Sequence, residues 1–239
     1  MKSYSKILLV SAAILALLSC SKENPQSGDE SAMPVPALVD LGLSVKWGSF
    51  NLGATKPEEY GGYYQWAGTQ DGRNRNLNIS NCPYHWGWDH ELSWTKYISS
   101  QFPGMWSGPG KPDNKVNLDP EDDAAHVHLG GSWRIPKDEE WRELIANCTW
   151  TWTNLNGVNG YLVTGKKEGY KDKSIFIPAA GRRMDDKTLY SGTDGYYWTS
   201  VLYIHYPVWA REMRFDAKNV EKYASRDREV GLPIRPVSK

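Results

Sequence analysis

The sequence contains few cysteines, has no excess charge of either sign, and has only one long apolar run. Three of its 239 residues are cysteines, and none of them follows Cys148. Lysine plus arginine and aspartate plus glutamate each number 28, so the formal net charge is zero. Proteins that bind nucleic acids through phosphate contacts need a positive surface. We therefore expect no nucleic-acid partner and no electrostatic attachment to a membrane.

Motifs of common catalytic sites are also missing from the sequence. The chain has no Gly-x-Ser-x-Gly elbow, no phosphate-binding loop and no His-Glu-x-x-His sequence. Neighbouring acids, such as Asp185 and Asp186, are typical of solvated turns, whereas a glycosidase needs two acids that face each other across a cleft. We expect no enzyme activity, no catalytic residue and no cofactor; an unrecognised hydrolase is the weakest alternative.

The apolar run occupies residues 7–18, and it follows Lys2 and Lys6. It ends in the sequence Leu-Leu-Ser-Cys at Cys20. A basic start, a short apolar core and small residues before a cysteine are typical of a secretory signal, and the run is too short to span a bilayer. The ending resembles a bacterial lipobox. Residues 1–20 are therefore predicted to be a lipoprotein signal peptide whose Cys20 carries acyl chains such as palmitate; the alternative is an ordinary signal peptide.

Residues 21–37 are polar and show no periodicity, which predicts a flexible tether. Ser21, in place of an aspartate, resembles an outer-membrane address, and residues 21–23 partly resemble the export signal of surface lipoproteins. We expect an outer-membrane lipoprotein at the cell surface, with the periplasmic face as the alternative. Loss of the leader removes two of the 28 basic residues and none of the 28 acidic ones, which leaves a net charge of −2.

Residues 38–239 are enough for one ordinary domain. Within it, residues 119–148 have the pattern helix, glycine turn, short strand, helix. Asp119 suits an N-cap and Pro120 the first helical position, and two glycines at 130 and 131 stop that helix. A second helix is predicted from Asp138. Its apolar face has the spacing i, i+3, i+4 and i+7, formed by Trp141, Leu144, Ile145 and Cys148.

Several motifs carry a resemblance to a known family. They are VDLGLSVKW at 39–47, PEEYGGYYQWAGT at 57–69, DDAA at 122–125, GGSWRIP at 130–136, EEW at 139–141, NCTWTWTNLNGVNGY at 147–161, SIFIPAAG at 174–181, GYYWTS at 195–200 and GLPIRPV at 231–237. The chain is similar to the Fibrobacter succinogenes major paralogous (FISUMP) domain of lipoproteins from Gram-negative gut anaerobes. More distantly, it resembles the formylglycine-generating-enzyme/sulfatase-modifying group.

The resemblance implies an α+β, C-type-lectin-like fold, in which two short helices pack on small mixed or antiparallel sheets with long loops. It also implies that the last strand pairs with the first. The formylglycine-generating enzymes use paired cysteines late in the domain, which this chain lacks, so that chemistry is not carried over.

Short β-rich segments predict the sheets. We expect a strand pair within residues 38–69, strands at 161–164, 174–178, 195–201 and 209–215, a polar turn at 182–187, and a last strand with Val230, Leu232 and Ile234. In the segment 209–215, alternation predicts a buried side with Trp209, Met213 and Phe215. The other side, with Ala210, Glu212 and Arg214, is expected to face solvent.

Residues 70–117 contain many Gly, Pro and Asn residues and little periodicity, which indicates a long functional loop. Its aromatic side chains would stack on sugars or anchor a protein if exposed, and would pack the loop onto the core if buried. The ligand-binding candidates in this loop are Tyr84, Trp86, Trp88, Trp94 and Trp106.

The sequence also contains candidate metal ligands and two cysteines that could form a disulfide. Asp122 and His126 have the i, i+4 spacing of two ligands, with Asp123 and His128 beside them, but helix capping explains these acids better. The calcium motifs of lectin-like domains are not matched, because Lys111-Pro112-Asp113 has a lysine in place of an oxygen ligand. We predict no metal site. Cys82 and Cys148 are either bridged, as an exported protein permits, or buried free thiols.

The leading hypothesis is a lipid-anchored, extracytoplasmic, non-catalytic binding module. Its ligand would be a glycan or a protein, recognised by aromatic side chains of the loop. The alternative is a structural or interaction subunit of a surface assembly.

Overall fold

The computed structural model describes residues 32–87, 93–101 and 110–239. The predicted signal peptide, Cys20, most of the tether, Trp88 and Trp106 lie outside the described residues. Residues 32–239 form one compact unit. No helix among the described residues is long and apolar enough to cross a membrane.

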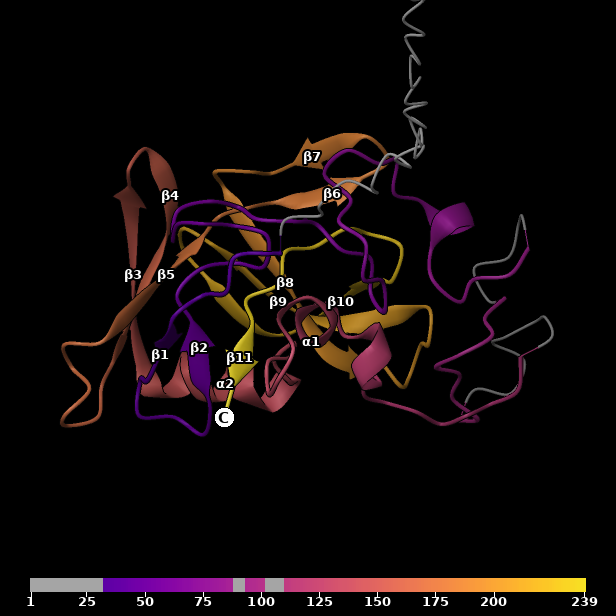
Figure 1. The fold of residues 1–239 in the computed structure, drawn as a ribbon, viewed down its shortest axis with the longest axis horizontal. Coiled ribbons are helices and arrows are strands. Elements are labelled where there is room, and N and C mark those ends of the chain that lie inside the picture. Colours follow the sequence, from indigo (N-terminus) through magenta and orange to yellow (C-terminus); the bar gives the residue numbers. More distant parts are fainter. Residues whose placement is uncertain (1–31, 88–92, 102–109) are drawn as a thin grey trace, which may run out of the picture. The chain divides into compact units, whose positions relative to one another are not determined.

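The described chain contains two α-helices, two 3-10 turns and eleven strands (Figure 1). The helical elements are η1 (Ile79–Asn81), η2 (Pro120–Asp122), α1 (Ala124–Leu129) and α2 (Asp138–Asn147). The first five strands are β1 (Leu38–Val39), β2 (Lys46–Gly48), β3 (Cys148–Leu155), β4 (Val158–Gly165) and β5 (Ser174–Pro178). The remaining strands are β6 (Arg182–Met184), β7 (Lys187–Leu189), β8 (Asp194–Leu202), β9 (Trp209–Asp216), β10 (Val220–Asp227) and β11 (Val237–Ser238).

These strands form four small sheets, in the orders β1-β2-β11, β3-β4-β5, β8-β9-β10 and β6-β7. Every strand pair in them is antiparallel. This content is consistent with the α+β class that the family resemblance implied, and also with a mainly-β class. The C-terminal strand β11 pairs with β2, the second strand, so both ends of the domain meet in one sheet (Figure 1).

The second predicted helix is confirmed, whereas the first is interrupted. In α2, Trp141 and Leu144 are buried on one face. The expected helix from Asp119 is a 3-10 turn, η2, followed by the separate helix α1. Asp123 separates them because its carboxylate accepts hydrogen bonds from the backbone N–H groups of His126 and Ile135. Asp123 is therefore the N-cap of α1, and the side chain of Asp119 makes no capping hydrogen bond.

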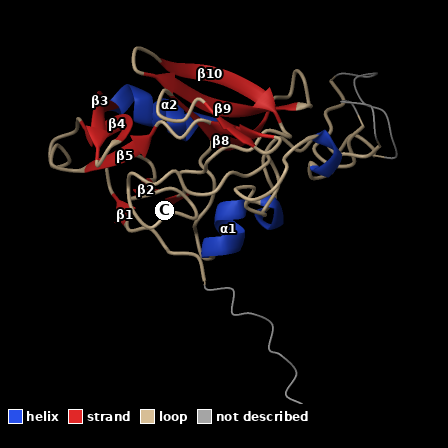
Figure 2. Cartoon of the chain, turned by 90° about the horizontal axis from the view of Figure 1, so that it is seen from above, coloured by secondary structure: helices blue, strands red, loops and turns tan. Residues whose placement is uncertain are grey.

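The sheet β8-β9-β10 is covered on both faces, which corrects the expectation for residues 209–215. On one face Tyr197, Met213 and Phe215 join the cluster that includes Trp141 of α2. Figure 2 shows α2 alongside this sheet, whereas α1 lies apart from it. On the other face, Ala210 is buried in a second cluster, and Glu212 is buried as well. Trp209, expected to be buried, is only half-buried.

Three further sequence expectations differ from the structure. Residues 182–187, expected to be a polar turn, contribute to the hairpin β6-β7, which Asp185 closes with a left-handed φ of 53°. Strands β3 and β10 were not predicted. Val230, Leu232 and Ile234 are buried as expected, but they precede the last regular strand, and Leu232 forms only an isolated bridge with Tyr64.

A buried arginine fixes the closure of the domain. Arg235 is fully buried next to β11, and its guanidinium donates to the carbonyl oxygens of Gly48 in β2 (3.0 Å) and Phe176 in β5 (2.7 Å). These two hydrogen bonds connect the C-terminal segment to two different sheets. A buried charge needs such partners, because an unpaired polar group in the interior is costly.

The two cysteines are buried free thiols in different parts of the core. Cys82 packs with Trp94, Ile98 and Val208, whereas Cys148 begins β3 and belongs to the cluster around α2. The disulfide that the sequence left open is therefore not formed in the structure.

Candidate functional site

A polar pocket of about 370 Å³ opens beside Tyr84, and we call it the Tyr84 pocket. Its lining combines one aromatic ring, side-chain amides, a guanidinium and two carboxylates. The lining residues are Gln65, Ala67, Gly68, Thr69, Gln70, Arg75, Asn81, Pro83, Tyr84, Glu121 and Asp122. Donors, acceptors and a ring in one concave surface are typical of sites for small polar ligands.

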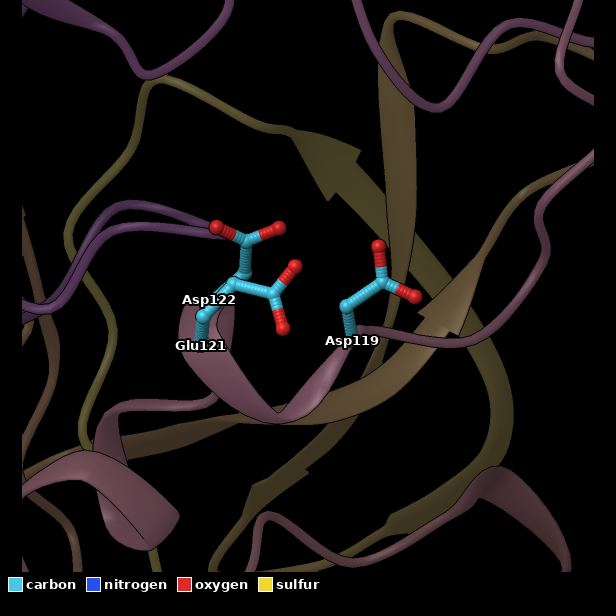
Figure 3. Close-up of side chains that lie close together, drawn as sticks. All are labelled: Asp119, Glu121 and Asp122. Carbon is cyan, nitrogen blue, oxygen red and sulfur yellow. The ribbon is translucent and has the colours of Figure 1, made fainter.

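The acidic wall of the pocket, Glu121 and Asp122, comes from the turn η2, and Asp119 precedes this turn. Figure 3 shows the carboxylates of Asp119, Glu121 and Asp122 close to one another. The ammonium group of Lys96 lies among them, 2.7 Å from Asp119, 2.6 Å from Asp122 and 3.4 Å from Glu121. The Lys96 ammonium occupies the position that a bound cation would otherwise take. The three carboxylates therefore already have a cationic partner from the chain itself.

Two tyrosines complete this arrangement, which we call the Asp122 network: Asp122, Lys96, Tyr84, Tyr97 and Asp119. The hydroxyls of Tyr84 and Tyr97 each donate to the Asp122 carboxylate over 2.5 Å. The Tyr97 hydroxyl also accepts a hydrogen bond of 2.8 Å from the backbone N–H of Asp119. Hydrogen bonds to a charged group contribute about 1.5–3 kcal/mol each, so the network ties the loop of residues 93–101 firmly to η2.

The network also shifts the pKa values of its members. Burial and the hydrogen bond to Asp122 raise the pKa of Tyr84 to about 12. The pKa of Tyr97 is raised by the same two causes. Burial acts against the charge of Lys96, but hydrogen bonds to Asp119 and Asp122 outweigh it and raise the pKa of this amine. All three groups are therefore protonated at neutral pH, as the hydrogen bonds require.

Backbone strain gathers at this site. Ala67, Tyr84 and Tyr97 have φ values of 64°, 63° and 60°, in the left-handed region that disfavours residues with a Cβ. Each such residue costs on the order of 1–3 kcal/mol, and strain of this kind is concentrated at binding and catalytic sites. Ala67 and Tyr84 line the Tyr84 pocket, whereas Tyr97 belongs to the hydrogen-bond network beside it.

The described ligand-binding candidates have different environments. Tyr84 is half-buried in the pocket, and Trp86 is 55% exposed. The chain forms a narrow hairpin here, since the N–H of Trp86 donates to Ser93 and the N–H of Thr95 donates to Tyr84. Trp94 is buried in the packing of the loop, so its selection as a ligand contact is wrong.

The burial of Trp94 has an identifiable cause. Its ring lies 3.8 Å from the guanidinium carbon of Arg228, and the ring of Trp66 lies 4.9 Å from the same atom. Arg228 is fully buried, and burial lowers its pKa to about 10. Cation–π contacts substitute here for the carboxylate that a buried arginine usually needs.

The structure adds residues that the sequence did not single out. Gln65 is buried, and its amide donates to the backbone of Asn78 and to the Asn81 side chain, both over 3.0 Å. Arg75 and Gln70 line the same pocket. No sequence signal marked these polar residues, because only tertiary contacts bring them beside Tyr84.

The four residues weighed as metal ligands do not form one group. Among the described residues, the cluster with metal-binding geometry is Asp119, Glu121 and Asp122. His128 lies 2.6 Å from the carbonyl oxygen of Thr69 through its Nε2 atom, and the Asp123 carboxylate accepts backbone hydrogen bonds.

Comparison of the chain with protein-family models, curated proteins and solved structures found no match. The family resemblance therefore remains a prediction from the sequence motifs.

Proposed function

We propose that this chain is a lipid-anchored, extracytoplasmic binding module that recognises a glycan in the Tyr84 pocket without catalysis. The observation that carries the proposal is the lining of that pocket. Side-chain amides, Arg75 and Glu121 offer donors and acceptors to sugar hydroxyls, and Tyr84 offers a ring. The exposed ring of Trp86, two residues later in the chain, would extend the contact.

The polarity of the lining favours a glycan over a protein ligand. Protein interfaces have their affinity concentrated in apolar and aromatic pockets, whereas this pocket has mainly amide, hydroxyl and charged groups. The alternative, a structural subunit of a surface assembly, does not require a strained, pre-organised pocket. A glycan ligand therefore accounts for more of the observed features.

A C-type-lectin-like fold is part of the proposal. Its support is the meeting of the first and last described strands in the sheet β1-β2-β11, the two short helices, and the little regular structure in the described part of residues 70–117. The family motifs of the sequence point in the same direction. The lipid anchor at Cys20 and the outer-membrane location rest on the leader sequence alone.

A glycan array probed with the chain from Ser21 onward tests the recognition. We expect saturable binding to a defined set of glycans, weakened about tenfold by Arg75→Met or Gln70→Ala, which corresponds to about 1.4 kcal/mol. Trp86→Ala should weaken it to a similar degree. Lys171→Met is the matched control, since Lys171 lies in the exposed loop between β4 and β5. Absence of glycan binding, or binding that these pocket variants leave unchanged, would contradict the proposal.

The anchor is tested separately by fractionation of cells that express the whole chain. We expect the wild-type chain in the outer-membrane fraction with incorporated labelled palmitate. Cys20→Ala should remove both the label and the membrane association. Label that persists in this variant would disprove the role of Cys20.

A further inference from the structure

A second cavity, of about 590 Å³, lies between the loop of residues 53–63 and the hairpins β3-β4 and β6-β7. It shares no lining residue with the Tyr84 pocket. The lining combines tyrosine rings and backbone with two carboxylates, and it consists of Gly53, Glu58, Glu59, Tyr60, Gly61, Tyr63, Arg73, Val158, Thr188 and Ser191. We call it the Tyr60 cavity.

The loop that forms this cavity is fixed by close backbone packing. Gly61 has a φ of 74°, and a Cβ at this position would lie 2.5 Å from the carbonyl oxygen of Leu52. Only glycine tolerates this conformation and this approach. Tyr63 is buried, and its hydroxyl donates to the carbonyl oxygen of Ala180 over 2.6 Å. The cavity is therefore built into the fold and does not depend on a loose loop.

The two carboxylates of the cavity are held by hydrogen bonds. Glu58 accepts a hydrogen bond from the Asn156 amide (3.0 Å), and Glu59 accepts one from the backbone N–H of Thr55 (2.6 Å). Within the part of the chain that the structure describes, neither carboxylate forms an ion pair. The guanidinium of Arg73 is already paired with Asp71 over 2.6 Å. The hydrogen bonds of Glu58 and Glu59 lower the pKa values of both carboxylates, and the ammonium group of Lys56 acts on both and lowers them further. Two carboxylates against this one ammonium leave the cavity with a net negative charge beside Tyr60.

Thr188 in the lining of the cavity belongs to β7, which pairs only with β6 among the described strands. In the hairpin β6-β7, Thr188 stands opposite Arg183. Arg183 exchanges both backbone hydrogen bonds with Gly231 on its other side. Arg183 and Thr188 therefore form a non-hydrogen-bonded pair, and the N–H and C=O of Thr188 point away from β6. An unpaired edge of this kind is a template for another extended segment.

We propose that the Tyr60 cavity binds an extended basic peptide segment, which adds to the edge of β7 and places a lysine or arginine side chain over Tyr60 and between Glu58 and Glu59. The carboxylates and the ring attract the same cation. The backbone of Thr188 offers one donor and one acceptor to the peptide backbone. This partner is a protein segment, so the inference does not depend on glycan recognition at the Tyr84 pocket.

Fluorescence anisotropy with a labelled, end-blocked pentapeptide of alternating valine and lysine tests the proposal on the chain from Ser21 onward. We expect saturable binding with a Kd on the order of 100 µM. An otherwise identical peptide with glutamate in place of lysine should not bind, because it places like charges together. The lysine peptide should bind several-fold more weakly at 0.5 M salt than at low salt, since exposed charges are screened.

Variants of the two carboxylates and of Thr188 test separately what the charge and the strand edge contribute to peptide binding. Glu58→Gln combined with Glu59→Gln should weaken peptide binding about tenfold, as expected for the loss of two charge contacts. Thr188→Pro should weaken it to a similar degree, because proline removes the edge N–H. Glu168→Gln and Thr188→Ser are the matched controls, and thermal melting checks that each variant is folded.

Three results would overturn the proposal. One is equal binding of the lysine and glutamate peptides, and another is lysine-peptide binding that the paired glutamine variant leaves unchanged. The third is unchanged binding by folded Thr188→Pro, which would refute addition to β7. Peptide binding that persists in Arg75→Met, while glycan binding is lost there, would show that the two sites are independent.

Discussion

Replacement of Asp122 by asparagine tests the Asp122 network most directly. The substitution keeps the shape of the side chain but removes its charge. In the wild type this carboxylate accepts hydrogen bonds from Tyr84, Tyr97 and Lys96, and only 6% of its side chain is exposed. The amide retains one acceptor oxygen and directs an NH₂ group at a donor, so at least one of the three donors loses its partner.

The expected loss of stability follows from these contacts. A hydrogen bond to a charged group contributes about 1.5–3 kcal/mol, and removal of one partner from a buried ion pair costs about 3–5 kcal/mol. Because the amide keeps part of the bonding, we expect Asp122→Asn to lower the free energy of unfolding by about 2–4 kcal/mol. For a domain of this size, that lowers the Tm by roughly 5–15 °C.

Urea denaturation at pH 7 measures the effect, and Asp119→Asn is the matched control. Asp119 makes the same kind of contact with Lys96, but 23% of its side chain is exposed, and we expect a loss below about 1 kcal/mol there. In a Lys96→Met background, Asp122→Asn should cost less than in the wild type, because the charge has lost one partner. Equal losses for the two aspartate variants, or a loss below about 0.5 kcal/mol for Asp122→Asn, would refute the reasoning.

The same variant can be followed at alkaline pH. The pKa values of Tyr84, Tyr97 and Lys96 are all raised in the folded protein. Below a pH of about 10 both states hold these protons, so their contribution to stability is complete. Above that pH the unfolded state loses protons first, and the stability falls. Asp122→Asn removes one cause of these shifts, so its stability should fall less steeply between pH 9 and 11.

Other substitutions test the packing of the core. A Cβ at Gly195 would lie 2.0 Å from an aromatic ring atom of β9, so Gly195→Ala should destabilise the domain by about 1–3 kcal/mol or more in urea denaturation. Arg228→Met should change stability by less than about 1 kcal/mol, because it removes a buried charge that has no carboxylate partner among the described residues. Arg228→Lys should destabilise more, since an ammonium cannot stack between the rings. Burial raises the pKa of Cys82 to about 12 and of Cys148 to about 11, so at pH 8 both thiols should react with a thiol reagent only after denaturation; a chain with no titratable thiols would indicate a disulfide.

The helix α2 could be predicted from the sequence because its signal is local. The spacing of Trp141 and Leu144 defines one buried face within a short segment, although Cys148, expected on the same face, ends the helix and begins β3. The break before α1 could not be predicted in this way. It depends on a hydrogen bond from Ile135 to the Asp123 carboxylate, between residues twelve positions apart that are brought together by the glycine turn.

The sheets were predicted less completely, for two different reasons. The hairpin β3-β4 had a readable signal, because Asn156-Gly157 is a strong turn sequence between alternating residues. The burial of Glu212 had no such signal in the sequence. A charged residue in an alternating strand indicates a solvent-facing side, but here a second layer covers it, and Arg226 provides a partner at 2.9 Å.

Tyr84 and Trp86 could be selected as candidates because they lie in a long loop with many aromatic residues. The pocket beside Tyr84 could not be predicted from the sequence of that loop. Gln65 and Asp122 come from segments far apart in the chain, and exposure does not follow from residue type, as the buried Trp94 shows.

The acidic residues at positions 119–122 form a sequence pattern that is compatible with two different structures. In the sequence, three carboxylates within four residues suit either a helix start or a cation site. The structure instead pairs them with Lys96, a residue of the long loop. If a metal ion occupied that position, only the tyrosine hydrogen bonds would connect the loop to η2. Lys96 is itself a residue of the loop, so its ion pairs with the acids connect the loop to η2 directly. We infer that the acidic turn holds the loop of residues 93–101 in place, so its charge supports the shape of the Tyr84 pocket as well as lining it.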